Sequence, residues 1–193
     1  KFTILVSGGS QGSQAINKVF MEVAKNLDKD SFRILHLTGA PDFDFVKNEY
    51  NRIGIANDTF SFLNDMAWAY SQSDLVICRA GAMTISEITA FGIASILVPY
   101  PHGDCHQKEN ANILKNANAA IVIEEEGLTK DVLSETIIKI SGDKEKLNEM
   151  KRNSRKLAKL DAADNLKKEV LNMVIAEMNH SNLVGWNHSN LVG

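Results

Sequence analysis

Three short segments of the sequence combine glycine with side chains that can bind phosphate or sugar hydroxyls. The first, Gly8–Ser13, reads Gly-Gly-Ser-Gln-Gly-Ser and directly follows an apolar run. The other two span residues 79–87 and 102–110 and contain arginine, threonine, glutamate, histidine, glutamine and asparagine. A glycine-rich turn that opens a helix presents bare N–H groups and the positive end of the helix dipole to an anion. The residue types therefore indicate an anion site, such as a phosphate site.

The first segment, Gly8–Ser13, differs from two common phosphate-binding motifs. It lacks the Gly-Lys-Ser/Thr ending of a P-loop, and Ser10 stands where the dinucleotide fingerprint has its second glycine. The following strand ends in Thr38 and Gly39, not in an acid that would bind a ribose 2′-hydroxyl. These differences disfavour NAD and ATP as ligands. A tight turn with close helix packing is the alternative interpretation of this segment.

Residues 79–87 also have two interpretations. Gly81 permits close backbone approach where a helix begins, so that Thr84 can meet a diphosphate and Glu87 can bind a ribose diol. The spacing of Thr84 and Glu87 is also that of a capping box, and spacing alone favours this second interpretation. Arg79 is an unpaired cation at the same edge, which makes it a phosphate partner or else a solvated or carboxylate-paired arginine.

Residues 102–110 contain five side chains that can form hydrogen bonds, namely His102, Asp104, His106, Gln107 and Asn110. The spacing of His102 and His106 suits a metal only within a helix, but a proline and a glycine interrupt this region and no third ligand is evident. We therefore expect no metal. Asp104 is expected to cap the following helix, and Glu124–Glu126 to form a solvated acidic turn.

These segments require a scaffold that brings them to one edge. Short apolar runs alternate with helical patterns, as in βαβ units around a parallel sheet. We expect strands at Phe2–Ser7, Phe32–Thr38, Thr59–Phe62, Leu75–Cys78, Ser95–Val98 and Ala120–Ile123. We expect helices at Gln14–Leu27, Phe43–Asn51, Met66–Gln72, Met83–Phe91, Gln107–Asn116, Lys130–Ile140, Lys144–Lys159 and Ala162–Met178. Right-handed crossovers then predict an α/β fold, a Rossmann-like parallel sheet with helices on both faces, whose ligands bind beyond the carboxyl ends of the strands.

The composition excludes several other classes of protein. With 44% hydrophobic and 23% charged residues, the 193-residue chain is typical of an ordinary globular domain. Its net charge of −3 argues against nucleic acid as a partner. Two cysteines, Cys78 and Cys105, are too few for a disulfide framework or a cysteine-based zinc cage and fit a reducing cytosol. No stretch approaches the roughly 20 apolar residues of a transmembrane segment.

The two ends of the chain differ from the rest. The sequence starts in a core strand without an initiator methionine, so we expect a fragment cut at a domain boundary. The seven-residue sequence Asn179–Gly185 is repeated identically as Asn187–Gly193, and Trp186 separates the two copies. We expect one domain over residues 1–178 and a non-native or disordered tail over 179–193, with a short interaction tail around Trp186 as the alternative.

Together, the three segments resemble the MurG family in order and spacing. The matching sequences are Gly8–Gly12, Cys78–Ile88 and Val98–His102, with Gln107 and Asn110-Ala111. MurG proteins add N-acetylglucosamine to the lipid-linked muramoyl-pentapeptide precursor of peptidoglycan. The resemblance covers residues 2–178 and implies one half of a glycosyltransferase B fold, the carboxyl-terminal domain that holds UDP-N-acetylglucosamine.

The resemblance implies a donor site built from four segments: Ser10, Gln11 and Gly12; Leu63 and Met66; Arg79, Gly81, Ala82, Thr84 and Glu87; and Gln107 and Asn110. In this scheme Glu87 binds the ribose and Thr84 faces the diphosphate. Leu63 and Met66 lie along the uracil. Gln107, with Asn110 behind it, addresses the sugar hydroxyls. MurG proteins often carry two adjacent glutamines here, and this chain has a histidine before Gln107, which concerns sugar recognition more than nucleotide binding.

The implied reaction is an inverting hexosyl transfer without a cofactor, in which helix N-termini and Arg79 stabilise the departing UDP. The resemblance places the catalytic base and the lipid acceptor in a missing amino-terminal domain, so we expect no catalytic residue here and little or no transfer by this chain alone. It also implies a cytoplasmic location, with the full-length parent on the inner face of the cell membrane. A free-standing donor-binding subunit that needs a membrane-bound acceptor subunit, and a Rossmann-like domain for another nucleotide, remain as alternatives.

Overall fold

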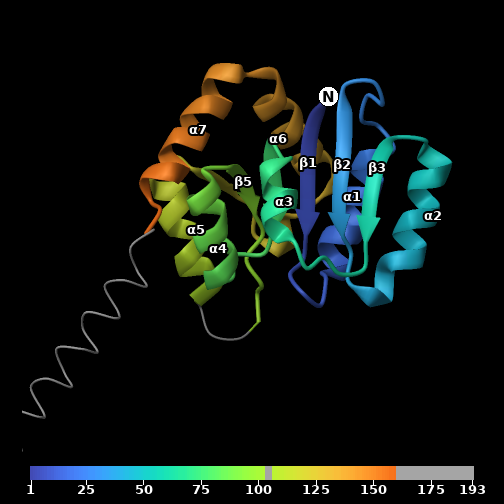
Figure 1. The fold of residues 1–193 in the computed structure, drawn as a ribbon, viewed down its shortest axis with the longest axis horizontal. Coiled ribbons are helices and arrows are strands. Elements are labelled where there is room, and N and C mark those ends of the chain that lie inside the picture. The colour runs from blue at the N-terminus through green and yellow to red at the C-terminus, as the bar shows by residue number, and fades with distance from the viewer. Residues whose placement is uncertain (103–105, 160–193) are drawn as a thin grey trace, which may run out of the picture. The chain divides into compact units, whose positions relative to one another are not determined.

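The computed structural model of the 193-residue chain describes residues 1–102 and 106–159, and its centre is a six-stranded parallel sheet (Figure 1). The strands are β1 (Phe2–Ser7), β2 (Phe32–Leu37), β3 (Ala56–Phe60), β4 (Leu75–Cys78), β5 (Ala94–Leu97) and β6 (Ala120–Val122). Their order in the sheet is β3-β2-β1-β4-β5-β6. The direction of winding therefore reverses between β1 and β4, where a doubly wound sheet has its ligand crevice. The predicted Rossmann-like parallel sheet is confirmed.

Seven helices and two short 3-10 turns connect the strands in the described part of the chain. The helices are α1 (Gln14–Ala24), α2 (Phe43–Ile53), α3 (Met66–Ser71), α4 (Ala82–Phe91), α5 (His106–Asn116), α6 (Lys130–Gly142) and α7 (Lys144–Lys156). The 3-10 turns are η1 (Ala40–Asp42) and η2 (Glu125–Gly127). The predicted helix over residues 162–178, the tail over 179–193 and the predicted cap at residue 104 lie outside the described residues.

Helices cover both faces of the sheet because the central strands are apolar on both sides. In β1, Ile4 packs in one buried cluster with side chains of α1, α2 and α6, while Leu5 packs in a second cluster with side chains of α3, α4 and α5. Alternate residues of a strand point to opposite faces, so an unbroken apolar run is what two covered faces require. The arrows of β1, β2 and β3 all end at the lower edge in Figure 1, so the loops that follow them meet there.

The strand β3 begins three residues earlier than the sequence predicts. It spans Ala56–Phe60, whereas the apolar pattern indicated Thr59–Phe62. As an edge strand it carries polar residues that an apolar pattern does not detect, and Asp58 forms an ion pair of 2.6 Å with Arg33 of the neighbouring strand. Phe62 lies beyond the strand and is 61% exposed, at the edge where the candidate ligand site lies.

A polar cluster, consisting of Asn17, His36 and Tyr50, is buried within the core. The side-chain amide of Asn17 donates to the backbone oxygen of Thr38 over 2.9 Å, which leaves Asn17 Oδ1 to accept from His36 Nε2 at 3.0 Å. The His36 Nδ1 atom, 2.8 Å from the Tyr50 hydroxyl, then accepts from it. Both nitrogens of a neutral imidazole are thereby satisfied, and complete burial lowers the pKa of His36 to about 3.

No helix within the part of the chain that the structure describes is long and apolar enough to cross a bilayer.

Candidate functional site

Two adjoining cavities open at the carboxyl edge of the sheet, next to the reversal point between β1 and β4. The α3–α4 cavity has a volume of about 430 Å³, and its walls include Ser10, Leu63, Met66, Tyr70, Met83 and Glu87. The glycine-loop cavity has a volume of about 700 Å³, and its walls include Gln11, Gly12, Arg79, Gly81, Tyr100 and Gln107. Gly9 and Thr84 belong to both walls, so the two cavities meet at these residues.

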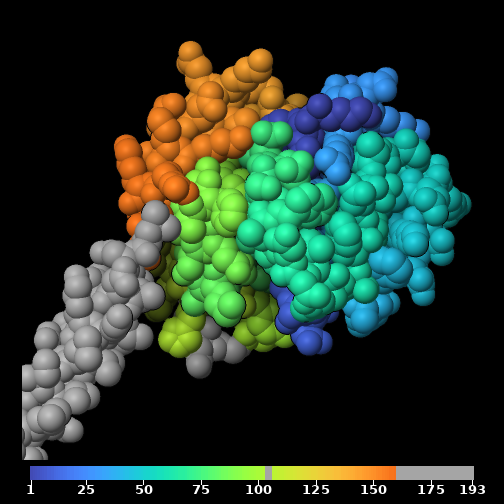
Figure 2. All heavy atoms as spheres, in the orientation of Figure 1, coloured from blue at the N-terminus to red at the C-terminus, as the bar shows by residue number. Residues whose placement is uncertain are grey.

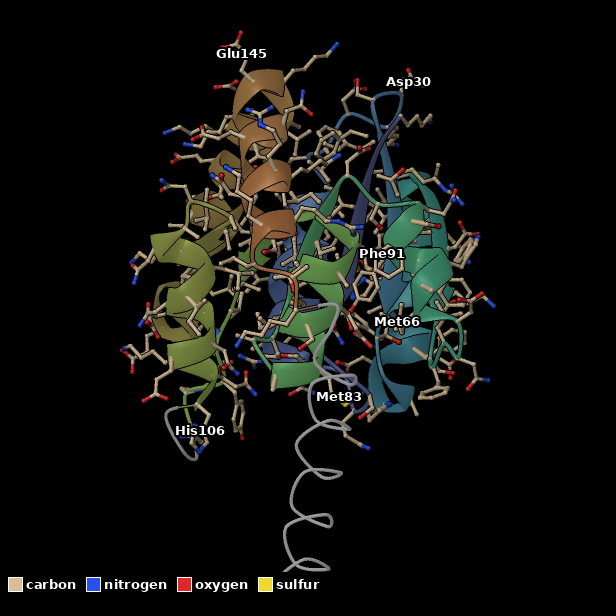
Figure 3. All side chains as sticks on the ribbon, turned by 60° about the vertical axis from the view of Figure 1, so that its left-hand side comes forward. Asp30, Met66, Met83, Phe91, His106 and Glu145 are labelled. Carbon is tan, nitrogen blue, oxygen red and sulfur yellow. The ribbon has the colours of Figure 1, made fainter. Side chains whose placement is uncertain are left out.

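The α3–α4 cavity has an apolar wall and one acidic group. Met66 and Tyr70 are four residues apart on α3 and therefore lie on one face of that helix. Met66 begins α3 and Met83 lies in the first turn of α4, and both line this cavity; Figure 3 labels them together with Phe91, the last residue of α4. Met83 is 77% exposed. Flexible thioethers beside a hollow of this size form a surface on which a flat ring can pack.

Glu87 does not form the capping box that its spacing favours. The helix α4 begins at Ala82 with Gly81 as its N-cap, so Glu87 is the sixth helical residue instead of the third. A capping box requires the glutamate at the third position, from which it can reach the N-cap N–H group. Instead, Glu87 Oε2 accepts a hydrogen bond of 2.9 Å from the Tyr70 hydroxyl. The other carboxylate oxygen has no protein partner in residues 1–102 and 106–159 and is available to a ligand in the cavity.

The start of α4 is the stronger of the two predicted anion sites. Its N-cap, Gly81, has no side chain to accept from the first N–H groups of the helix, and no other side chain in the described structure caps them. The first N–H groups of a helix have no partner within the helix, so they remain available to an anion. The start of α1 is different, because the Ser13 hydroxyl accepts from the Ile16 N–H group at 3.4 Å.

The glycines of the first loop are needed for close backbone packing. Gly12 has a φ of +75°, and a Cβ atom there would collide with the backbone oxygen of Thr38. Gly39, with a φ of +76°, approaches the backbone of Gln11 in the same way. The predicted tight turn is therefore present, and it packs against the turn that follows β2. This contact fixes the backbone of Gln11 and Gly12, which line the glycine-loop cavity.

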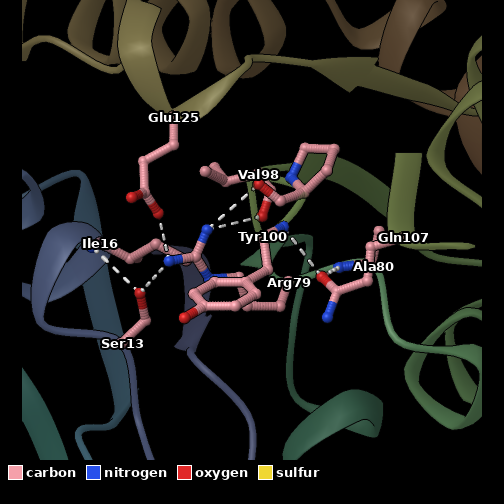
Figure 4. A network of polar contacts seen from close by, with 9 residues as sticks. Ser13, Ile16, Arg79, Ala80, Val98, Tyr100, Gln107 and Glu125 are labelled. Carbon is pink, nitrogen blue, oxygen red and sulfur yellow. Dashed lines mark hydrogen bonds and ion pairs between the residues drawn. The ribbon is translucent and has the colours of Figure 1, made fainter. Parts of the chain in front are cut away.

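Arg79 is not the unpaired cation that the sequence indicates (Figure 4). Its guanidinium donates to the backbone oxygens of Val98 and Pro99, each at 3.2 Å, and to the Ser13 hydroxyl at 2.8 Å. It also forms an ion pair with Glu125, and the Arg79 side chain is only 11% exposed. Arg79 therefore ties together the start of α1, the end of β5 and the turn η2, all of which border the glycine-loop cavity.

This ion pair also corrects the prediction for the acidic turn Glu124–Glu126. Glu125 is bound by Arg79 at the cavity wall and is not simply solvated, while Glu124 lies 3.2 Å from Lys108. A carboxylate within the wall screens the positive charge of Arg79 from a ligand. Positive potential at this edge must then come mainly from the uncapped start of α4.

Gln107 uses one half of its amide to hold the backbone and leaves the other half free. Its Oε1 atom accepts from the N–H groups of Ala80 at 3.2 Å and Tyr100 at 3.0 Å. Its Nε2 group has no partner among the residues that the structure describes, and Gln107 lines the glycine-loop cavity. Asn110 donates to the backbone oxygen of Ala80 at 3.1 Å and, like Ala82, lies outside both cavity walls.

Neither metal ligands nor an activated thiol are present in the described part of the site. No group of three His, Cys, Asp or Glu side chains in residues 1–102 and 106–159 could hold a metal ion. Cys78 is buried, and burial together with the nearby Glu87 raises the pKa of its thiol to about 12. Its thiolate, the nucleophilic form, is therefore scarce at neutral pH.

The structure thus brings ten of the twelve predicted site residues to the walls of two cavities that touch, leaving out Ala82 and Asn110. Tyr70 was not predicted from the sequence, because an aromatic residue in a short helix is usually part of the hydrophobic core. Its spacing of four residues from Met66 is the signal that could have placed it beside the site.

Comparisons with known proteins agree with this geometry. Residues 3–166 match the glycosyltransferase family 28 C-terminal domain. A Coxiella burnetii protein named UDP-N-acetylglucosamine–N-acetylmuramyl-(pentapeptide) pyrophosphoryl-undecaprenol N-acetylglucosamine transferase is 44% identical over 82% of this chain and 45% of its own length. A Geobacter protein of the same name is 43% identical over 84% of this chain and 44% of its own length.

Solved structures show the same relationship. The crystal structure of Acinetobacter baumannii MurG matches with a TM-score of 0.81 and 30% identity, over 89% of this chain and 52% of that one. The kitacinnamycin glycosyltransferase, at 20% identity and a TM-score of 0.65, shares the fold. This chain spans about half the length of these relatives, and the match confirms the resemblance to MurG and to one half of a glycosyltransferase B fold. The chain belongs to glycosyltransferase family 28, whose C-terminal domain its residues 3–166 represent.

Proposed function

We propose that this chain is the donor-binding half of an N-acetylglucosaminyltransferase and binds UDP-N-acetylglucosamine. The uridine occupies the α3–α4 cavity, the diphosphate lies at the start of α4, and the sugar occupies the glycine-loop cavity. The names of the relatives, which specify transfer of N-acetylglucosamine to a lipid-linked muramyl pentapeptide, support this donor and the lipid-linked acceptor.

One observation carries the proposal: the two cavities meet at Gly9 and Thr84, where α4 begins without a side-chain cap. A nucleoside diphosphate sugar has two neutral ends joined by a doubly charged diphosphate. The site offers matching features in the same order: a largely apolar hollow, a row of free N–H groups, and a hollow whose lining includes polar side chains such as Gln107. Helix N-termini are well suited to bind phosphate oxygens.

Each end of the ligand finds suitable groups in this arrangement. The free oxygen of Glu87 accepts from the ribose hydroxyls, and Leu63 and Met66 pack along the uracil. On the other side, the free Nε2 group of Gln107 donates to a sugar hydroxyl. Arg79 acts mainly at a distance, because both of its terminal nitrogens already donate to Ser13 and its other protein partners.

The reaction that fits this donor site is an inverting transfer. An acceptor hydroxyl attacks the anomeric carbon, the bond to the diphosphate breaks, and UDP leaves with the negative charge. The N–H groups at the start of α4 stabilise that charge as it develops. We propose that the base which takes the acceptor proton belongs to the other half of the enzyme, which meets its lipid-linked acceptor at the inner face of the membrane. Transfer by this chain alone is then expected to be negligible.

The sharpest test of the site is Glu87→Ala. If the carboxylate binds the ribose, its loss lowers the affinity for UDP by about 1–3 kcal/mol, as expected for a lost hydrogen bond to a charged group. Calorimetric titration with UDP measures this change. Glu135→Ala is the matched control, because Glu135 is an exposed glutamate on α6 and lines neither cavity.

The same titrations test the choice of nucleotide. We expect UDP and UDP-N-acetylglucosamine to bind, and NAD and ATP to bind much more weakly. Tighter binding of NAD or ATP would overturn the proposed function. Equal affinity of the wild type and Glu87→Ala for UDP would remove Glu87 from the ribose site.

A further inference from the structure

We propose that Tyr70 is a positioning residue, which orients the Glu87 carboxylate toward the ribose and so sets the preference of the site for ribonucleotides over deoxyribonucleotides. This inference rests on the proposed function, because it assumes that Glu87 faces a ribose. It goes beyond that function by assigning the discrimination between two nucleotide classes to a residue on a different helix.

The contact between Tyr70 and Glu87 joins α3 to α4. These helices lie side by side on the face shown in Figure 2. The Tyr70 hydroxyl donates to Glu87 Oε2 over 2.9 Å, and the ring is only 3% exposed. The ring also packs against Phe91 with a centroid distance of 5.5 Å. Tyr70 is therefore held on both sides and presents its hydroxyl from a fixed position.

Tyr70 has no competitor for this role among the described residues. No cation in residues 1–102 and 106–159 pairs with Glu87, and no second donor in that part of the chain reaches its carboxylate. Burial raises the pKa of Tyr70 well above its usual range, and the neighbouring Cys78 and Glu87 act in the same direction. The hydroxyl thus keeps its proton and remains a donor at physiological pH.

The orientation of a carboxylate matters for binding a diol. The last torsion angle of a glutamate side chain is broad, so a free carboxylate samples many directions. With Oε2 held by Tyr70, the second oxygen is presented to the α3–α4 cavity in one direction. A ligand that lacks the 2′-hydroxyl loses part of the interaction with this oxygen, and the loss is largest when the oxygen is already in place.

The test compares UDP with 2′-deoxy-UDP in calorimetric titrations of the full chain and of Tyr70→Phe. Phenylalanine keeps the ring and its packing but removes the hydroxyl. We expect the affinity ratio of UDP to 2′-deoxy-UDP to be about tenfold in the wild type, the equivalent of one modest hydrogen bond. In Tyr70→Phe this affinity ratio is expected to fall to about twofold. The Glu87 carboxylate is then mobile and must be ordered on binding, so its hydrogen bond to the 2′-hydroxyl contributes less binding free energy.

The matched control is Tyr50→Phe. Tyr50 is also buried and also donates its hydroxyl to one side chain, His36, but it packs in the other core cluster. The Tyr50→Phe variant should have a lower free energy of unfolding than the wild type but the same affinity ratio of UDP to 2′-deoxy-UDP. An unchanged ratio in Tyr70→Phe, or an equal loss of affinity for both ligands, would overturn the inference.

A double-mutant cycle separates positioning from direct contact. In a Glu87→Ala background, Tyr70→Phe should have no further effect on the ratio, because Tyr70 acts through the Glu87 side chain. If Tyr70→Phe lowers the affinity ratio in this background as much as it does in the wild type, Tyr70 binds the ribose itself. If the wild type does not distinguish UDP from 2′-deoxy-UDP, or does not bind UDP, the proposed ribose site fails first. If the wild type prefers UDP to 2′-deoxy-UDP and Tyr70→Phe keeps the same preference, the proposed ribose site stands and only the role assigned to Tyr70 is wrong.

Discussion

Replacing Arg79 by alanine is expected to lower the free energy of unfolding by about 3–5 kcal/mol. The substitution leaves the Glu125 carboxylate, with an exposed fraction of 26%, without its cation. It also removes the donors to two backbone oxygens and to the Ser13 hydroxyl that caps α1. An uncompensated charge in a partly buried place costs far more than the loss of an exposed pair. Urea unfolding followed by circular dichroism measures the difference.

The chain offers a matched control for this experiment in Arg33→Ala. Arg33 also forms one ion pair, with Asp58, but the two side chains are 35% and 44% exposed. An exposed pair of this kind contributes at most about 1 kcal/mol, so Arg33→Ala should be nearly neutral. The double variant Arg79→Ala/Glu125→Ala should recover part of the loss, since no charge is then left without a partner. Equal losses for the two single variants would contradict the assigned role of Arg79.

The second large effect is a loss of stability in acid caused by His36. Its pKa is about 3 in the folded chain and about 6.5 in an unfolded one, so the unfolded state binds the proton first as the pH falls. Each pH unit between these values then reduces the free energy of unfolding by about 1.4 kcal/mol. The free energy of unfolding should therefore reach its full value above pH 7. At pH 4.5 the titration of His36 alone should make it about 2.5 kcal/mol lower.

Carboxylates titrate in the same range, so the measurement needs a variant that lacks only the imidazole. His36→Gln serves this purpose, because its amide can donate to Asn17 and accept from Tyr50. Unfolding curves between pH 7.5 and 4.5 should show a steeper loss for the wild type than for His36→Gln. Parallel curves for the two proteins would contradict a neutral, buried His36.

The architecture could be predicted from the sequence because its signals are local. Apolar runs such as Leu75–Cys78 stand next to glycine turns, and their regular alternation with helical patterns predicts a parallel sheet and its ligand edge. The predicted bounds were wrong for β3, because this strand is defined by its pairing with a neighbouring strand and not by an apolar run of its own. The polar edge strand β3 is recognised through its pairing with β2, including the Arg33–Asp58 ion pair, and that pairing is not visible in the run itself.

Ten of the twelve residues predicted for the site line the two cavities, but their contacts were not predicted. Thr84 and Glu87 were identified as candidates, yet their spacing favoured a cap because the start of α4 at Ala82 could not be fixed to within two residues. Tyr70, the partner of Glu87, lies 17 positions away along the chain, and Glu125, the charged partner of Arg79, lies 46 positions away. Such pairings are set by the packing of helices and loops on the sheet, which no short window of sequence contains.

The shared wall of the two cavities has a consequence for inhibitor design. Because hollows of about 430 and 700 Å³ meet at Gly9 and Thr84, two small fragments can each occupy one of them and nearly touch. A short, rigid linker between such fragments turns the second binding event into an intramolecular one and raises its effective concentration to the millimolar range or above. If the donor binds as proposed, an uncharged linker that accepts hydrogen bonds from the start of α4 takes the place of its diphosphate, whose charge hinders entry into cells.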